Sequence, residues 1–198
     1  MEEIKMSYSL YKVFIDPGHG GTDVGAKNGT FYEKDFALDI AKHTRDRLAS
    51  YGVKTKMSRE TDISGKLYVD ERSDASNAFG ADIFVSIHNN AGGGTGVETW
   101  KHDNASTYVN QLAQSVNSKL VSNLGVANRN VRTAPSQRGE NIYVLDPKNT
   151  NAWAILPEVL FMDTTADLEK LKSSTFRRNA GYAIADGIIS FINTLPPR

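Results

Sequence analysis

The chain has 198 residues, of which 39% are hydrophobic, and this length and composition fit one compact domain with a single core. Its 23 basic and 23 acidic residues give a formal net charge of zero, which argues against nucleic acid or an anionic membrane surface as a partner. The sequence has no cysteine, so disulfides, thiolate zinc sites and cysteine nucleophiles are excluded, and any metal must be bound by His, Asp or Glu.

The two ends of the chain contain no targeting or membrane signal that we identify. Residues 1–10 lack a basic segment followed by a long apolar run, so we expect no signal peptide. No apolar run approaches the roughly 18 residues that a membrane-spanning helix needs. We expect residues 1–198 to form a single domain, and residues 193–198, which end in Pro-Pro-Arg, to be the start of a linker.

Strand and helix patterns alternate along the first half of the chain. Short runs rich in β-branched and aromatic residues predict strands, and apolar residues at helical spacing predict helices that end at glycine. The predicted elements are a strand over 11–16 that leads into the glycine-rich loop 17–21, a helix over 33–50, a strand over 53–57, a helix over 67–79 and a strand over 81–87.

The second half continues the same pattern, with one polar segment that we expect to be irregular. Gly181 and Gly187 are weak points in the last predicted helix because glycine disfavours helix interiors. The predicted elements are a strand over 96–100, a helix over 105–124, an irregular segment over 126–139, strands over 141–145 and 153–162, and a closing helix over 167–192.

This order of elements predicts an α/β fold with a mostly parallel, twisted sheet and helices on both faces. The strand over 81–87 is the most apolar of the first half, so we expect it near the centre of the sheet. In such sheets, ligands bind beyond the carboxyl ends of the strands. His19 and His88 both follow predicted strands at that edge.

A metal site is one interpretation of these two histidines. Imidazole is a common zinc ligand, and a catalytic zinc ion usually has three protein ligands and a water. Glu33 begins a helix just after the first loop, so its carboxylate is a candidate third ligand, although a carboxylate there also simply stabilises a helix amino terminus. The spacing matches no short zinc motif such as His-Glu-x-x-His, so both interpretations stay open.

Other candidate sites have less support in the sequence. His43, within an amphipathic helix, and His102, after a strand among polar residues, are expected to be surface groups. The glycine-rich loop lacks both the Walker spacing and the full Gly-x-Gly-x-x-Gly pattern, which argues against nucleotide binding. No nucleophile-elbow motif supports a serine hydrolase.

A family resemblance covers nearly the whole chain. Its motifs are Val13–Gly21, Asp23, Gly25-Ala26, Glu33-Lys34, Ser58-Arg59, Asp62, Leu67, Arg72, Ala81–Ala91 and Gly96-Val97-Glu98. In this order they resemble the zinc-dependent N-acetylmuramoyl-L-alanine amidases of the "amidase 3" type. The resemblance implies that His19, Glu33 and His88 bind zinc, the same residues that the pattern of strands and loops suggests.

The resemblance also implies a catalytic glutamate, whose position depends on the alignment register. The family strand Pro-Ala-Val-Leu-Val-Glu matches residues 153–158, which places the base at Glu158, although Trp153 replaces the family's proline. A second register, which aligns Pro157 with that proline, puts Met162 at the catalytic position, with Asp163 beside it. Methionine cannot act as a base, so we prefer Glu158.

The implied function is zinc-dependent hydrolysis of the amide bond between the lactyl group of N-acetylmuramic acid and L-alanine in bacterial peptidoglycan. Zinc lowers the pKa of water to about 7 and polarises the scissile carbonyl, and Glu158 takes the proton of the water and passes it to the leaving amine. The expected partner is the cell wall, with neither nucleic acid nor membrane. We expect a monomer that lacks a wall-binding domain and is released by lysis, as a phage endolysin or a mother-cell autolysin is.

Three other functions remain in competition. Another zinc hydrolase of wall peptides, such as a carboxypeptidase, needs the same metal and base. A wall-binding module with this fold needs no chemistry, and a structural α/β domain carries its histidines incidentally. Bound zinc separates the last of these from the others, and new amino groups released from peptidoglycan identify the amidase.

Overall fold

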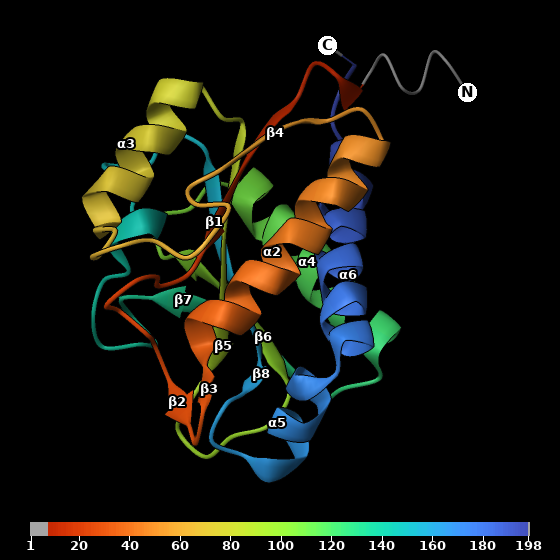
Figure 1. Ribbon diagram of the computed structural model, residues 1–198. Helices are drawn as coiled ribbons and strands as arrows, with labels where there is room; N and C mark the ends of the chain where they lie inside the picture. The colour runs from red at the N-terminus through yellow and green to blue at the C-terminus, as the bar shows by residue number, and fades with distance from the viewer. Residues whose placement is uncertain (1–7, 198) are drawn as a thin grey trace.

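A six-stranded sheet in the order β4-β1-β5-β8-β6-β7 lies at the centre of the computed structural model, which describes residues 8–197 (Figure 1). All neighbouring strands are parallel except β6 and β8, which pair antiparallel. The mostly parallel α/β fold predicted from the sequence is therefore confirmed. The strands are β1 (Lys12–Pro17), β4 (Lys54–Met57), β5 (Ile83–Asn90), β6 (Val97–His102), β7 (Asn128–Ala134) and β8 (Trp153–Phe161).

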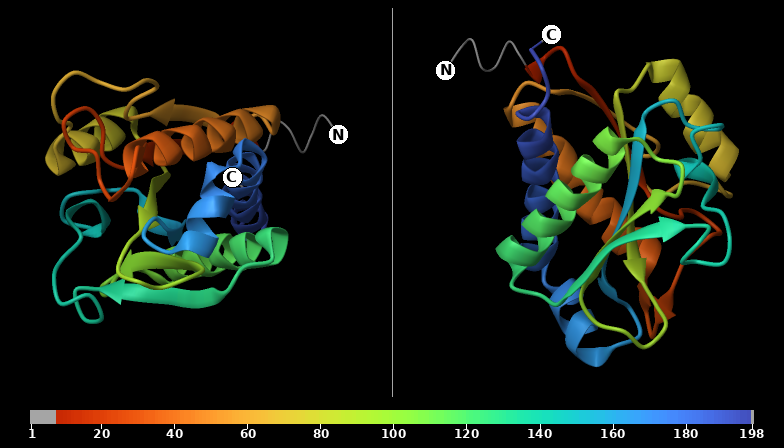
Figure 2. Two further views of the ribbon diagram at one scale, coloured as in Figure 1. Left: turned by 60° about the horizontal axis from the view of Figure 1, so that its bottom comes forward. Right: turned by 180° about the vertical axis from the view of Figure 1, so that it is seen from behind.

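Helices cover both faces of the sheet, as Figures 1 and 2 show. One face packs against α2 (Glu33–Ser50), α4 (Thr107–Leu124) and α6 (Ser174–Ile192), and the short α5 (Thr165–Lys172) precedes α6. The other face is covered by α3 (Val69–Phe79) and the 3-10 helix η1 (Tyr143–Leu145). Central strands are apolar on both sides for this reason.

Strand β5 shows how one segment serves two cores. Ile83, Val85 and Ile87 belong to the core shared with α2, α4 and α6. Phe84, between them, belongs to the smaller core on the opposite face. Successive side chains of a strand point to opposite faces, so a strand covered on both sides has a continuous apolar run. This confirms the central position that the sequence predicted for this strand.

The closing helix differs from the prediction in where it breaks. Gly181 and Gly187 lie inside α6 without interrupting it. A Cβ at Gly181 would lie 2.6 Å from Ile40 O, and a Cβ at Gly187 would lie 2.6 Å from Val116 Cα, so no larger side chain fits at either position. The two glycines thus let α6 approach the backbones of α2 and α4. The break falls instead at Ser173, whose Oγ accepts a hydrogen bond from Phe176 N at 3.3 Å and caps α6.

Three other segments also depart from the sequence prediction. The polar segment expected to be irregular contains β7, an edge strand whose half-exposed position tolerates polar side chains. In the segment 141–145, where a strand was predicted, residues 143–145 form η1, and Val144 and Leu145 pack into the smaller core against the sheet. An additional two-stranded hairpin joins β2 (Lys27–Asn28) and β3 (Phe31–Tyr32) just before α2.

The expectations for the chain ends concern residues that are only partly described. Of residues 1–10, the first seven lie outside the described part of the chain, so the expected lack of a signal peptide stays a prediction. Of residues 193–198, Leu195 packs against the main core, and Arg198 lies outside the described part. Among residues 8–197, no helix has the length and apolar character that crossing a membrane requires.

Candidate metal centre

His19, Glu33 and His88 come from three separate segments that meet at the carboxyl edge of the sheet. His19 lies two residues beyond the end of β1, and Glu33 is the first residue of α2. His88 lies within β5, which continues to Asn90, so the expectation that His88 follows its strand is wrong. Since β1 and β5 are parallel neighbours, their carboxyl ends bring the two histidines together.

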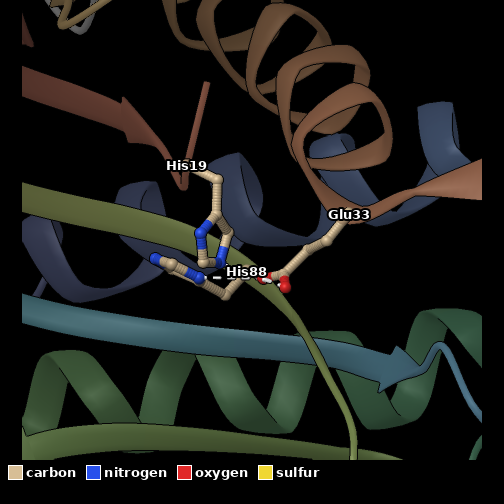
Figure 3. A group of neighbouring side chains, drawn as sticks. All are labelled: His19, Glu33 and His88. Atoms are coloured by element: carbon tan, nitrogen blue, oxygen red, sulfur yellow. Dashed lines mark hydrogen bonds and ion pairs between the residues drawn. The ribbon is translucent and has the colours of Figure 1, made fainter. Parts of the chain in front are cut away.

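The three side chains point toward one another, as Figure 3 shows. His19 Nε2 lies 3.1 Å from Glu33 Oε2, and His88 Nδ1 lies 2.9 Å from Glu33 Oε1. The two imidazole rings meet edge to face with their centroids 4.9 Å apart. One ligating atom from each residue lies within 4.8 Å of the other two. Two imidazoles and one carboxylate are a donor set that suits a catalytic zinc ion.

Glu33 is held in place by backbone as well as by the histidines. It is 4% exposed, and its two carboxylate oxygens accept hydrogen bonds from Ala26 N at 2.8 Å and from Asn89 N at 3.1 Å. Burial acts to raise the pKa of Glu33, but the hydrogen bonds with His19 and His88 outweigh it and bring that pKa well below its ordinary value. Glu33 is therefore ionised, as a metal ligand must be.

Asp23 orients the His19 ring from the opposite side. Its Oδ1 lies 2.9 Å from His19 Nδ1 and also accepts a hydrogen bond from Gly25 N. Burial acts to raise the pKa of Asp23, but its contacts with His19 lower it overall, so Asp23 is a carboxylate that can accept a hydrogen bond from Nδ1–H of His19. This leaves Nε2 of His19 to face Glu33. A hydrogen bond from the other ring nitrogen to a carboxylate, as between His19 and Asp23, is typical of metal-ligating histidines. No role was predicted for Asp23 from the sequence, although a carboxylate four residues after a loop histidine is a usable signal.

Two glycines make room for the three side chains. A Cβ at Gly18 would lie 2.4 Å from His88 Cε1. A Cβ at Gly25, where φ is +67°, would lie 2.5 Å from His19 Cδ2 and 2.6 Å from Glu33 Oε2. Glycine at these two positions is thus a steric requirement of the site.

Glu158 lies beside this group on β8, directly opposite His88 on β5. It is 9% exposed, and its Oε2 has no hydrogen-bond partner among the described residues. Burial, together with the negative charges of Glu33 and Glu98, raises the pKa of Glu158 well above its ordinary value. Asp163, the alternative from the second register, lies in the turn after β8, where Oδ2 accepts hydrogen bonds from Gly92 N and Gly93 N.

The other two histidines lie outside the group. His43, on α2, is partly exposed and packs against Tyr182 of α6. His102 is the last residue of β6 and is only 7% exposed, so the expectation that it is a surface group is wrong. Its Nδ1 accepts a hydrogen bond from Asn104 N, and its Nε2 lies 3.9 Å from Asp146. The His102 ring contacts both the segment after β6 and the end of η1, a tertiary contact that the sequence pattern did not reveal.

The group opens into a cleft with a volume of about 590 Å³. The cleft is lined by the three convergent side chains and Glu158, by the segment around the start of α3, and by η1 with the residues before it. The residues of these last two segments include Lys66, Leu67, Val69, Arg138, Ile142 and Tyr143. A cleft of this size accommodates part of a polymer, not only a small ion.

Comparisons with known proteins all point to one family of enzymes. The family described as N-acetylmuramoyl-L-alanine amidase matches residues 13–190. The sporulation-specific N-acetylmuramoyl-L-alanine amidase of Bacillus subtilis is 35% identical over 186 residues, covering 93% of this chain and 69% of that protein. The endolysin of Bacillus phage SPP1 is 34% identical, covering 91% of this chain and 66% of that protein. The crystal structure of an N-acetylmuramoyl-L-alanine amidase from Clostridium difficile 630 superposes with a TM-score of 0.84 at 34% identity, covering 94% of this chain and 98% of that one.

Proposed function

The chain belongs to the N-acetylmuramoyl-L-alanine amidase family and hydrolyses an amide bond of bacterial peptidoglycan, and we propose that it does so with zinc bound by His19, Glu33 and His88. The bond cleaved is the one between the lactyl group of N-acetylmuramic acid and L-alanine. The observation that carries the proposal is the convergence of three ligating atoms within 4.8 Å of one another, from residues that line the cleft.

The donor set supports zinc over harder cations. Two imidazole nitrogens and one carboxylate suit zinc, whereas calcium and magnesium prefer oxygen ligands. A zinc ion in this position supplies Lewis-acid chemistry, lowering the pKa of water to about 7 and polarising a carbonyl oxygen. Asp23 holds the His19 ring in one orientation, and the backbone N–H groups of Ala26 and Asn89 hold the Glu33 carboxylate.

In this proposal Glu158 moves the proton. Its carboxylate lines the cleft beside His88 and accepts a proton from the water that attacks the scissile carbonyl. It then donates that proton to the nitrogen of the leaving L-alanine, so that the peptide departs as an amine. General acid-base catalysis of this kind contributes about 100- to 10,000-fold to a rate.

Mass spectrometry of digested peptidoglycan tests the bond. An amidase releases peptides with a free amino terminus at L-alanine and leaves intact muramic acid on the glycan. A carboxypeptidase, the competing zinc hydrolase, releases a single carboxyl-terminal amino acid and leaves the peptide attached. Products of the second kind alone would refute the proposed bond.

We further propose where, and in what form, the enzyme acts. The enzyme acts on the cell wall. Since the candidate centre is complete within one chain, we propose a monomeric catalytic domain, which light scattering of the purified protein tests. The names of two relatives, an endolysin and a sporulation-specific amidase, support release to the wall by lysis of the producing cell.

A further inference from the structure

Two buried arginines, Arg59 and Arg72, hold the loop that carries His19. Each is 4% exposed. Arg59 donates from Nε to His19 O at 3.0 Å and from Nη2 to Gly18 O at 2.8 Å. Arg72 donates from Nη1 to Pro17 O at 3.0 Å and from Nη2 to His19 O at 2.8 Å. The three consecutive carbonyl groups of the loop are thus all held by guanidinium groups.

The same arginines connect this loop to the other two ligand segments. Arg59 Nη2 also donates a hydrogen bond, at 2.8 Å, to the carbonyl oxygen of Lys34, which is the residue after Glu33. Arg72 forms an ion pair with Asp16 at 2.5 Å, and the second oxygen of Asp16 accepts a hydrogen bond from Ser86 Oγ at 2.7 Å. Ser86 lies on β5, two residues before His88. One hydrogen-bond network therefore reaches all three segments.

The backbone of His19 needs such support. Its φ is +59°, in the left-handed region that non-glycine residues seldom adopt. Such a conformation is strained and persists only where its surroundings fix it. Here the carbonyl of His19 itself accepts from both arginines. The strained conformation is the one that turns the imidazole toward Glu33.

Burying the charged guanidinium of Arg59 costs folding free energy that a carboxylate partner would normally offset. Among residues 8–197, no carboxylate lies within ion-pair distance of its guanidinium, and its Nη1 has no hydrogen-bond partner. Burial and the nearby charge of Arg72 lower the pKa of Arg59. Replacing buried ionic groups by apolar residues is often neutral or stabilising, so stability alone gives little reason for a cation here. What the guanidinium supplies is a rigid fork of donors for several carbonyl groups at once.

We propose that Arg59 and Arg72 are positioning residues that pre-form the metal centre by fixing the His19 loop against Glu33 and His88. The proposal rests on the proposed zinc site. Partners of metal ligands that act from outside the coordination sphere typically contribute 10- to 100-fold to metal affinity. Neither arginine is a ligand, so both act only through the loop.

Zinc affinity, measured by competition with a chromophoric chelator, tests this without reference to catalysis. In Arg59→Ala and Arg72→Ala we expect zinc to bind about 10- to 100-fold more weakly than in the parent protein. The matched control is Arg177→Ala. Arg177, on α6, has a side chain that is 16% exposed, donates to Leu171 O and Lys172 O and pairs with Asp39 of α2. It contacts none of the carbonyl groups of residues 17–19, so its loss should lower stability while leaving zinc affinity unchanged.

The conservative variants separate positioning from folding. Arg59→Lys keeps the charge but loses the fork, so we expect an affinity between those of Arg59→Ala and the parent. It also serves as the test if Arg59→Ala does not fold. Added guanidinium ion at millimolar concentration should restore part of the zinc affinity of Arg59→Ala, which a general loss of stability would not allow.

Three results would overturn either the zinc site or the positioning role of the arginines. If the parent protein bound no zinc, the proposed zinc site itself would be wrong. If the parent bound one zinc ion and the folded Arg59 and Arg72 variants bound it equally well, the site would stand and the positioning role would be refuted. A decrease in Arg177→Ala equal to that in Arg59→Ala would also refute it.

Discussion

His88 and Glu158 lie directly opposite each other on the parallel strands β5 and β8. Residues paired in this way point to the same face of a sheet, about 5 Å apart along the hydrogen-bonding direction. Glu158 is in turn opposite Glu98 on β6. The register of the sheet therefore sets the proposed base beside a proposed metal ligand, although 70 residues separate them in the chain.

Removing the basic carboxylate should stop catalysis while leaving the metal bound. In Glu158→Gln the volume is kept and no proposed ligand is lost, so we expect turnover to fall by at least about 100-fold with unchanged zinc content. The measurement is release of muramoyl-linked peptide at matched zinc content. Asp163→Asn is the control, since Asp163 caps Gly92 and Gly93 in a turn. Near-normal turnover in Glu158→Gln and loss in Asp163→Asn would transfer the role of base to Asp163.

Removing a ligand should remove the metal. His88→Ala deletes one of three convergent donors, so we expect elemental analysis to find less than one zinc ion per chain where the parent has one. A chelator should abolish the parent's activity, and added zinc should restore it, because binding to the native state is reversible by mass action. Full zinc occupancy in His88→Ala would exclude His88 as a ligand.

The remaining histidines should be dispensable for metal binding. His43→Asn and His102→Asn are both expected to retain zinc, since neither side chain lies in the convergent group. His102 is buried, so its replacement should also cost about 1 kcal/mol of stability, or about 2–4 °C in Tm for a domain of this size. Calorimetry and elemental analysis of the two variants check this. Loss of turnover in His102→Asn with zinc intact would instead indicate contact with substrate.

Gly25 and Gly29 offer a matched pair for the steric requirement of the site. Both have positive φ, +67° and +60°, so alanine at either position carries a similar backbone cost of about 1 kcal/mol. Only at Gly25 would the added methyl meet His19 and Glu33, whereas nothing lies within 4 Å at Gly29. We expect Gly25→Ala to lose at least about tenfold in zinc affinity and Gly29→Ala to lose none. Equal affinities in the two variants would show that the loop adapts.

Local patterns in the sequence predict a large part of this protein. Helical spacing of apolar residues predicted α2 with the bounds that it has, and the apolar run of residues 81–87 predicted the central strand. Because side-chain periodicity follows from local backbone geometry, such helices and strands can be predicted without knowledge of the fold. The same patterns placed His19 and His88 at one edge of a parallel sheet, where the structure brings them together with Glu33.

The tertiary structure alone decided the features that depend on distant partners. Strand β7 tolerates polar side chains because it is an edge strand, and α6 keeps Gly181 and Gly187 because its backbone packs closely against those of α2 and α4. No local sequence pattern predicts that Arg59 and Arg72 donate hydrogen bonds to the carbonyl groups of residues 17–19, or that the side chain of His102 is buried. Burial and hydrogen bonding between segments are set by which surfaces meet, and a single sequence encodes that only through the folded chain.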